Sequence, residues 1–161
     1  MCSATNAFVR CARHKHLVRR YEAKIAKMSL KKCRIVTAWL EAEDYPTLLG
    51  CCDLGISLHY SSSGLDLPMK VLDMFGAGMP VCAVDFACLS ELVRDGENGL
   101  VFAHQTGAGR GEQLARQLHD LFSEFSNGTT ALLDKLRSGV KPGSWSDNWM
   151  QHARQVLFPR P

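Results

Sequence analysis

The sequence predicts an α/β protein with a parallel sheet, and two observations carry this prediction. Short apolar runs rich in β-branched residues alternate with segments of helical periodicity, as in successive βαβ units. The 161 residues are 46% apolar and 22% charged, which is the size and composition of one globular domain with a real core. We therefore expect a single domain built around this sheet.

The first expected elements lie between residues 17 and 52. Apolar side chains at helical spacing predict a helix over 17–29, and the β-branched run at 33–37 predicts a strand. A second helix is expected over 43–52, with Asp44 as its cap and Pro46 in its first turn.

The middle of the chain is expected to hold two strands with a helix between them. The strands are the apolar runs at 54–58 and 80–84. The helix is expected over 68–78, where Asp66 can cap it and Pro68 suits its first turn. Ligands bind beyond the carboxyl ends of parallel strands, so the loop after residue 58 lies on the edge where a ligand is expected.

The rest of the chain is expected to be mostly helical. A short helix, a turn, a strand and two longer helices are expected at 89–93, 95–99, 100–102, 112–125 and 130–138. The glycine-rich stretch 106–111 is interpreted as a flexible linker, because no strand–turn–helix arrangement supports a phosphate-binding motif there. Trp145 and Trp149 are four residues apart, and we expect them to pack a last helix onto the sheet or onto another domain.

Basic residues crowd the amino-terminal end, although the formal net charge is only +3. The first 21 residues contain arginines and a lysine but no acidic residue. Three interpretations stay open: a transit peptide, a basic patch facing anionic lipid, or the edge of a domain. We assign residues 1–16 to a divergent basic segment and 17–161 to the domain. The mild charge does not indicate a nucleic-acid partner.

Neither membrane spans nor metal sites are expected. No apolar run is long enough to span a bilayer, and the amino-terminal end lacks the apolar core of a signal peptide, so we expect a soluble, cytosolic chain. The seven cysteines include no CxxC pair. Those inside apolar runs are expected to be reduced core residues: Cys33, Cys51, Cys52 and Cys82. No metal cluster is apparent, and no cofactor is expected.

The serine-rich loop and the helix after it form the candidate binding site. Ser62, Ser63 and Gly64 are small enough for the backbone to approach a ligand, and a helix N-terminus reached through such a loop attracts an anion. Lys70 adds a cation in the first turn, and Asp73 can accept hydrogen bonds from sugar hydroxyls. These groups suit a sugar diphosphate such as a nucleotide sugar. The alternative is an ordinary connection between a strand and a helix.

A second loop on the same edge carries Trp39 and Leu40, which follow the strand at 33–37. Both loops can serve one ligand, with Ser63 and Gly64 at the phosphates and Trp39 and Leu40 near a base. The alternative is that Trp39 is a packing aromatic residue at a domain edge.

Four segments resemble the chitobiosyldiphosphodolichol β-mannosyltransferase family. They are residues 39–46, 61–74, 80–84 and 97–102. The match runs from about residue 20 to residue 102, and more loosely to Trp149. The resemblance implies a single Rossmann-like parallel-sheet domain, the carboxyl-terminal, donor-binding half of a GT-B glycosyltransferase. The membrane anchor and the acceptor-binding half are expected to be absent.

The resemblance also implies an activity and a location. Such an enzyme transfers mannose from GDP-mannose to dolichyl-diphosphate-linked chitobiose, with inversion, in assembly of the N-glycan precursor. It works on the cytosolic face of the endoplasmic reticulum membrane. The implied partners are therefore GDP-mannose, the dolichyl-linked acceptor and the membrane surface.

The chain departs from the family pattern in three places. Residues 1–16 carry neither the strand nor the Gly-Lys-Gly-Pro loop that precede the first helix in relatives. His59 and Tyr60 replace a His-Thr pair. Related retaining enzymes carry two glutamates eight positions apart, and here Leu65 stands eight positions before Asp73. This broken pair fits an inverting enzyme and also removes one donor contact.

Inverting transfer needs a general base on the acceptor hydroxyl and stabilisation of the departing diphosphate. In our interpretation Ser63 and Gly64 present backbone N–H groups to the diphosphate, Lys70 offsets its growing negative charge, and Asp73 holds the ribose hydroxyls. No catalytic residue is assigned, because the base is expected in the missing half, so we expect the isolated chain to turn over poorly or not at all. The alternatives are a non-catalytic nucleotide- or protein-binding relic, a retaining glycosyltransferase of another pathway, and a flavodoxin-like domain without a role in sugar transfer.

Overall fold

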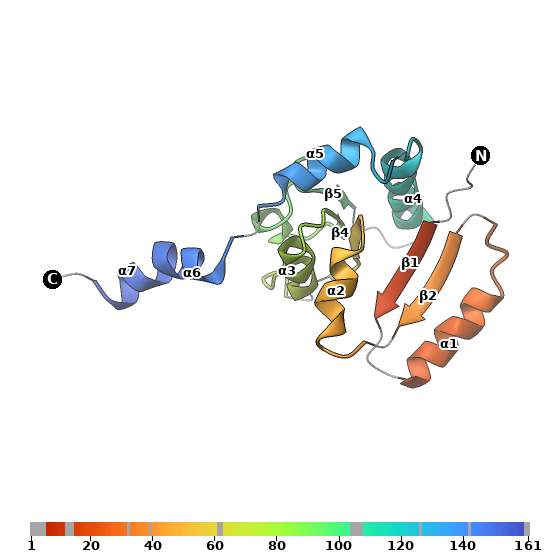
Figure 1. The fold of residues 1–161 in the computed structure, drawn as a ribbon, viewed down its shortest axis with the longest axis horizontal. Helices are drawn as coiled ribbons and strands as arrows, with labels where there is room; N and C mark the ends of the chain where they lie inside the picture. The colour runs from red at the N-terminus through yellow and green to blue at the C-terminus, as the bar shows by residue number, and fades with distance from the viewer. Residues whose placement is uncertain are drawn as a thin grey trace. The chain divides into compact units, whose positions relative to one another are not determined.

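The computed structural model describes residues 6–11, 15–31, 33–38, 40–60, 63–103, 108–125, 127–141 and 143–159. The chain divides into two compact units, Met1–Thr47 and Leu48–Pro161. Each unit contains a parallel sheet, so the predicted α/β class is confirmed (Figure 1).

The first unit contains β1 (Asn6–Cys11), α1 (Lys15–Ala26) and β2 (Cys33–Ala38). The two strands pair in parallel, with Asn6 opposite Cys33 and Cys11 opposite Ala38, and α1 contacts β2. The Thr37 hydroxyl donates a hydrogen bond to the Glu22 carboxylate at 2.6 Å and so ties β2 to α1.

The prediction that residues 1–16 lack a strand was wrong. Asn6–Cys11 forms β1 and pairs with β2 along its whole length. The run Ala-Phe-Val inside it is too short to predict a strand on its own. Pairing of the backbone with β2 supplies the hydrogen bonds that an isolated segment of this length lacks.

Helix α2 (Asp44–Gly50) matches the expected helix but begins differently. Asp44 is its first residue and not its cap, and the backbone N–H groups of Asp44 and Tyr45 both donate to the Glu41 carbonyl, at 3.2 and 3.3 Å. A turn closed on Glu41 therefore precedes the helix and takes Asp44 into helical geometry.

The second unit has a sheet of three parallel strands, β3 (Gly55–Ser57), β4 (Val81–Val84) and β5 (Gly99–Phe102), in the order β3-β4-β5. Gly55 pairs with Val81, and Val81 pairs with Gly99. The three predicted strands are confirmed, with ends shifted by at most one residue.

The helical elements of this unit lie mostly where they were predicted. They are α3 (Met69–Gly76), the 3₁₀ turn η1 (Leu89–Glu91), α4 (Ala108–Phe122), α5 (Ala131–Gly139), α6 (Trp145–Asn148), the π-helix η2 (Trp149–Ala153) and α7 (Arg154–Leu157). The linker expected at 106–111 was wrong in part, because Ala108–Gly111 forms the first turn of α4. The amphipathic stripe of α4 packs on the core, and this packing offsets the low helix propensity of its glycines.

The core is organised around β4, all four residues of which are buried. Val81 and Ala83 point to one face, where they pack with Val71 and Phe75 of α3. Cys82 and Val84 point to the other face, and they pack with three leucines of α4 and α5: Leu121, Leu133 and Leu136. Both faces of the sheet are therefore covered, as the predicted buried strand requires.

The described cysteines are free thiols: Cys33, Cys51, Cys52, Cys82 and Cys88. Burial, helped by the nearby Asp95 carboxylate, raises the pKa of the Cys82 thiol to about 12. The prediction of core cysteines was wrong for Cys33 and Cys51, which are exposed. Cys33 begins the exposed end of β2, and Cys51 follows the last residue of α2.

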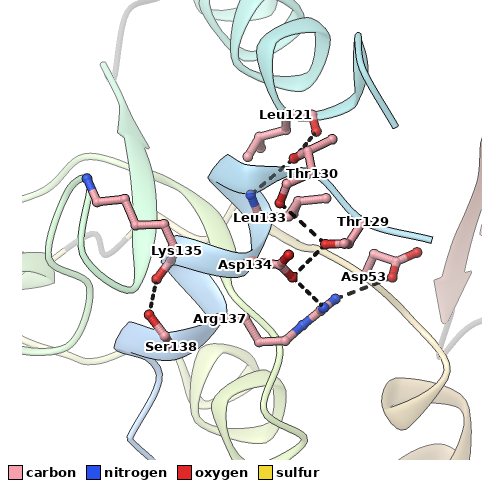
Figure 2. Close-up of polar contacts among 9 residues, drawn as sticks. All are labelled: Asp53, Leu121, Thr129, Thr130, Leu133, Asp134, Lys135, Arg137 and Ser138. Carbon is pink, nitrogen blue, oxygen red and sulfur yellow. Dashed lines mark hydrogen bonds and ion pairs between the residues drawn. The ribbon is translucent and has the colours of Figure 1, made fainter. Parts of the chain in front are cut away.

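The amino-terminal end of α5 is held by a polar network (Figure 2). The Thr130 hydroxyl accepts from the Leu133 backbone N–H at 3.2 Å and donates to the Leu121 carbonyl at 2.9 Å. Within α5, the Arg137 guanidinium bridges the carboxylates of Asp53 and Asp134, at 3.4 and 3.5 Å. These contacts join α5 to α4 and to the segment that enters β3.

The two tryptophans near the carboxyl-terminal end stack on each other, with ring centroids 5.3 Å apart and an interplanar angle of 9°. Trp145 is 76% exposed, so it does not pack a helix onto the sheet, and the alternative of packing onto another domain stays a prediction. Their spacing of four residues is satisfied by mutual stacking along one helical face. In the described residues, no helix is both long enough and apolar enough for a bilayer span.

We expect Thr130→Val to destabilise the Leu48–Pro161 unit by about 1–2 kcal/mol, because the valine loses both the cap and the bond to α4. Urea denaturation followed by circular dichroism measures the change. Thr130→Ser keeps the hydroxyl and is the matched control, with an expected loss below about 0.5 kcal/mol. Equal losses for serine and valine would contradict the capping role.

Candidate functional site

The candidate site lies at the carboxyl edge of the second unit's sheet. β3 ends at Ser57 and β4 ends at Val84, and the segments 58–68 and 85–88 follow them. The strands are parallel neighbours, so both segments leave the same edge of the sheet. The sequence prediction of a ligand-binding edge after this strand is therefore consistent with the topology.

Several polar contacts fold the serine-rich loop. Nε2 of His59 lies 2.8 Å from Oδ2 of Asp66, so the imidazole N–H donates to the carboxylate across seven residues. The Ser63 hydroxyl lies 3.5 Å from Oδ1 of Asp66 and accepts from the Leu65 backbone N–H at 3.3 Å. The described part of the loop is thus organised around the Asp66 carboxylate.

Gly64 occupies the left-handed region, with a φ of +74°. A side chain at this position would be strained, and its Cβ would lie 4.0 Å from the Cβ of Ala87. The loop after β3 therefore lies against the loop after β4, at a position that requires glycine. The expectation that Gly64 lets the backbone approach a ligand stays a prediction.

Helix α3 starts at Met69, and the cap position is held by Pro68, which makes no side-chain hydrogen bond. The prediction that Asp66 caps the helix was wrong. Asp66 lies two residues before the cap position, and its carboxylate is turned toward His59 and Ser63. Proline restricts the preceding Leu67 to extended backbone, which moves Asp66 away from the first turn.

Lys70 and Asp73, both predicted as ligand contacts, pair with each other. Nζ of Lys70 donates to Oδ2 of Asp73 at 2.9 Å, within α3. The side chains are 69% and 36% exposed, so the pair is a surface ion pair that contributes about 0–1 kcal/mol.

The other predicted site residues lie in different parts of the chain. Trp39 and Ser62 lie outside the described residues. Leu40 is half-buried and belongs to the Met1–Thr47 unit, whereas Ser63, Gly64, Lys70 and Asp73 belong to the Leu48–Pro161 unit. The joint use of both loops by one ligand stays a prediction.

The structure adds residues that sequence reasoning did not assign to the site. His59, Asp66 and Phe86 come together beside the serine loop, since the His59 ring meets the Phe86 ring edge-on at 6.2 Å. The usable signal in the sequence was a histidine two residues after a strand and an aspartate shortly before the next helix.

Among the described residues, no group of three or more His, Cys, Asp or Glu side chains is arranged to hold a metal ion. Cys88 lies near the site, where loss of solvation and the carboxylates of Glu91 and Asp66 raise the pKa of its thiol. The described residues at this edge thus bring together an ammonium, an imidazole, a hydroxyl and carboxylates, which are groups that can bind a phosphate with attached hydroxyls.

Known proteins share much of this sequence. The chain is 50% identical over 149 residues to the chitobiosyldiphosphodolichol β-mannosyltransferase of Mus musculus, a match that covers 88% of the chain and 30% of the relative. It is 46% identical over 140 residues to the UDP-glycosyltransferase TURAN of Arabidopsis thaliana, over 85% of the chain and 29% of the relative. The chain therefore spans less than a third of the length of these relatives.

A solved structure supports the fold. The chain superposes on Anabaena Alr3699/HepE, crystallised with UDP-glucose, with a TM-score of 0.54 and 21% identity, over 84% of the chain and 35% of that protein. At this identity the likeness concerns the fold, which is part of a GT-B glycosyltransferase fold.

Residues 10–124 match the family described as glycosyl transferases group 1, and this range includes β2 to β5 and the whole serine loop. The chain belongs to the group 1 glycosyltransferases and is homologous to part of the chitobiosyldiphosphodolichol β-mannosyltransferases.

Proposed function

We propose that this chain binds the nucleotide-sugar donor of an inverting mannosyl transfer, and that the donor is GDP-mannose. The homology to β-mannosyltransferases, at 50% identity in the mouse relative, supports the donor sugar. The observation that carries the proposal is the loop at the carboxyl edge of the sheet, where Gly64 adopts positive φ and Lys70 stands in the first turn of α3.

In this proposal the backbone N–H groups of Ser63 and Gly64 contact the donor diphosphate, with Ser62 beside them. Lys70 exchanges its surface partner Asp73 for the phosphate oxygens, because the existing pair contributes little. The released Asp73 carboxylate then accepts hydrogen bonds from the ribose hydroxyls. During transfer, Lys70 and the backbone dipoles offset the negative charge that grows on the departing GDP.

The acceptor is proposed to be dolichyl-diphosphate-linked chitobiose, at the cytosolic face of the endoplasmic reticulum membrane. The chain corresponds to less than a third of its relatives, so we propose that the general base and most acceptor contacts come from residues outside it. Trp39 and Leu40 are proposed to lie near the guanine base.

Calorimetric titration of the 161-residue chain with GDP and UDP tests the donor site. Binding of GDP in preference to UDP supports the proposal. Preference for UDP would redirect it to a uridine-linked donor, the nucleotide named in the Arabidopsis relative. Absence of binding by both nucleotides would contradict a donor site and favour a protein-interaction role.

Lys70→Ala is expected to weaken GDP binding by about 1–3 kcal/mol, because a charge-assisted contact to the diphosphate is lost. The matched control is Arg94→Ala. Arg94 also forms an exposed i,i+3 ion pair, with Glu97 at 3.0 Å, but it lies just before β5 at the opposite edge of the sheet. Equal affinities of Lys70→Ala and the wild type in calorimetry would remove Lys70 from the site.

Asp73 is tested with 2′-deoxy-GDP. We expect the wild type to bind it about 0.5–1.5 kcal/mol more weakly than GDP, because one hydroxyl contact is missing. Asp73→Asn is expected to narrow this difference while retaining most of the GDP affinity. An unchanged preference for ribose in Asp73→Asn, measured by the same titration, would assign the ribose contact to another residue.

Catalysis is tested by mannose transfer from GDP-mannose to a chitobiosyl-lipid acceptor. We expect GDP binding with little or no turnover by the isolated chain, because the base is proposed to lie outside it. Robust turnover would refute this incompleteness, and the anomeric configuration of the product would then separate inversion from retention. The assay can also be repeated with the remaining part of a relative added as a separate polypeptide. GDP binding without mannose transfer under these conditions would favour a non-catalytic relic.

A further inference from the structure

We propose that His59 is a positioning residue, which locks the serine loop in the conformation that receives the donor diphosphate. The proposal rests on the proposed function, and it assigns a role to a residue pair that the donor contacts above leave unused. The pair is His59 with Asp66, joined at 2.8 Å.

The pair closes the loop between two rigid elements. His59 stands two residues after the end of β3, and Asp66 stands three residues before the start of α3. Their side chains meet across seven residues, so they span the segment 60–65 that contains Ser63 and Gly64. A contact at the base of a loop reduces the number of conformations that the loop can adopt.

Asp66 also contacts a residue inside the loop, so holding Asp66 in place restrains that residue too. Its second carboxylate oxygen faces the Ser63 hydroxyl at 3.5 Å, and that hydroxyl accepts from the Leu65 N–H at 3.3 Å. Gly64 lies between these residues with φ at +74°. The orientation of the Ser63 and Gly64 backbone thus depends on where Asp66 is held.

His59 is itself anchored to the core. Its ring meets Phe86 edge-on, with centroids 6.2 Å apart and an interplanar angle of 72°. Phe86 is 8% exposed and packs with Val71 and Phe75 of α3. The imidazole therefore contacts a buried ring on one side and the Asp66 carboxylate of the exposed loop on the other, and so links the loop to the core.

The pair also suits an anionic ligand electrostatically. A carboxylate beside the loop repels a diphosphate, and the imidazole N–H that points at Asp66 offsets part of that negative field. An apolar residue at position 59 would leave the Asp66 carboxylate facing the ligand without this partner.

Hydrogen–deuterium exchange in the absence of nucleotide tests the restraint. His59→Ala should speed exchange of the Gly64, Leu65 and Asp66 amides, while those of α5 stay unchanged. His59→Gln keeps an N–H donor at a similar reach but loses the ring that meets Phe86, so its exchange should lie between that of the wild type and that of His59→Ala. Faster exchange in His59→Gln equal to that of His59→Ala, or unchanged exchange in His59→Ala, would overturn the restraint.

Calorimetric titration with GDP then tests whether the restraint of the serine loop helps donor binding. We expect GDP to bind about three- to tenfold more weakly to His59→Ala and to Asp66→Ala, with no further loss in the double variant and a smaller loss in His59→Gln. Additive losses, or a full loss in His59→Gln, would overturn positioning and point to direct ligand contact. If the wild type binds no GDP while the variants still show the expected exchange rates, the proposed donor binding is wrong, but the restraint of the loop by His59 is still supported.

Discussion

Burial of β4 on both faces is the constraint on which the Leu48–Pro161 unit depends. Val81 and Ala83 on one face, and Cys82 and Val84 on the other, leave no solvated side for the sheet. Helices must then cover both faces, and parallel connections of this kind bring the loops after β3 and β4 to one edge. The position of the serine loop follows from this burial, before any ligand is considered.

The carboxyl edge of this sheet combines buried core residues with exposed polar residues. Phe86 and Val71 are buried beneath it, while Lys70 and Ser63 are exposed above it. Exposed groups bind and release a charged ligand at little cost, but their own weak contacts do not hold a geometry. A buried ring that touches the loop through His59 supplies the missing rigidity.

The contacts proposed for the serine loop are to the donor diphosphate and not to the nucleotide base. The diphosphate is common to GDP- and UDP-linked donors, so backbone N–H groups and one ammonium serve either of them. Discrimination between guanine and uracil requires contacts to the base, and Leu40, proposed for that contact, belongs to the other compact unit. In the proposed function, diphosphate binding and base selectivity therefore depend on different residues.

The sequence by itself determined the α/β class, the three strands of the second sheet and the location of the candidate loop, because apolar periodicity and glycine positions act locally. It did not reveal β1, whose short run Asn6–Cys11 depends on pairing with β2. It also suggested Asp66 as a helix cap, whereas tertiary structure turned that carboxylate to His59. The partner of such a side chain depends on the path of the loop and on the residues that pack behind it. Both are set by contacts between segments that are distant in the sequence.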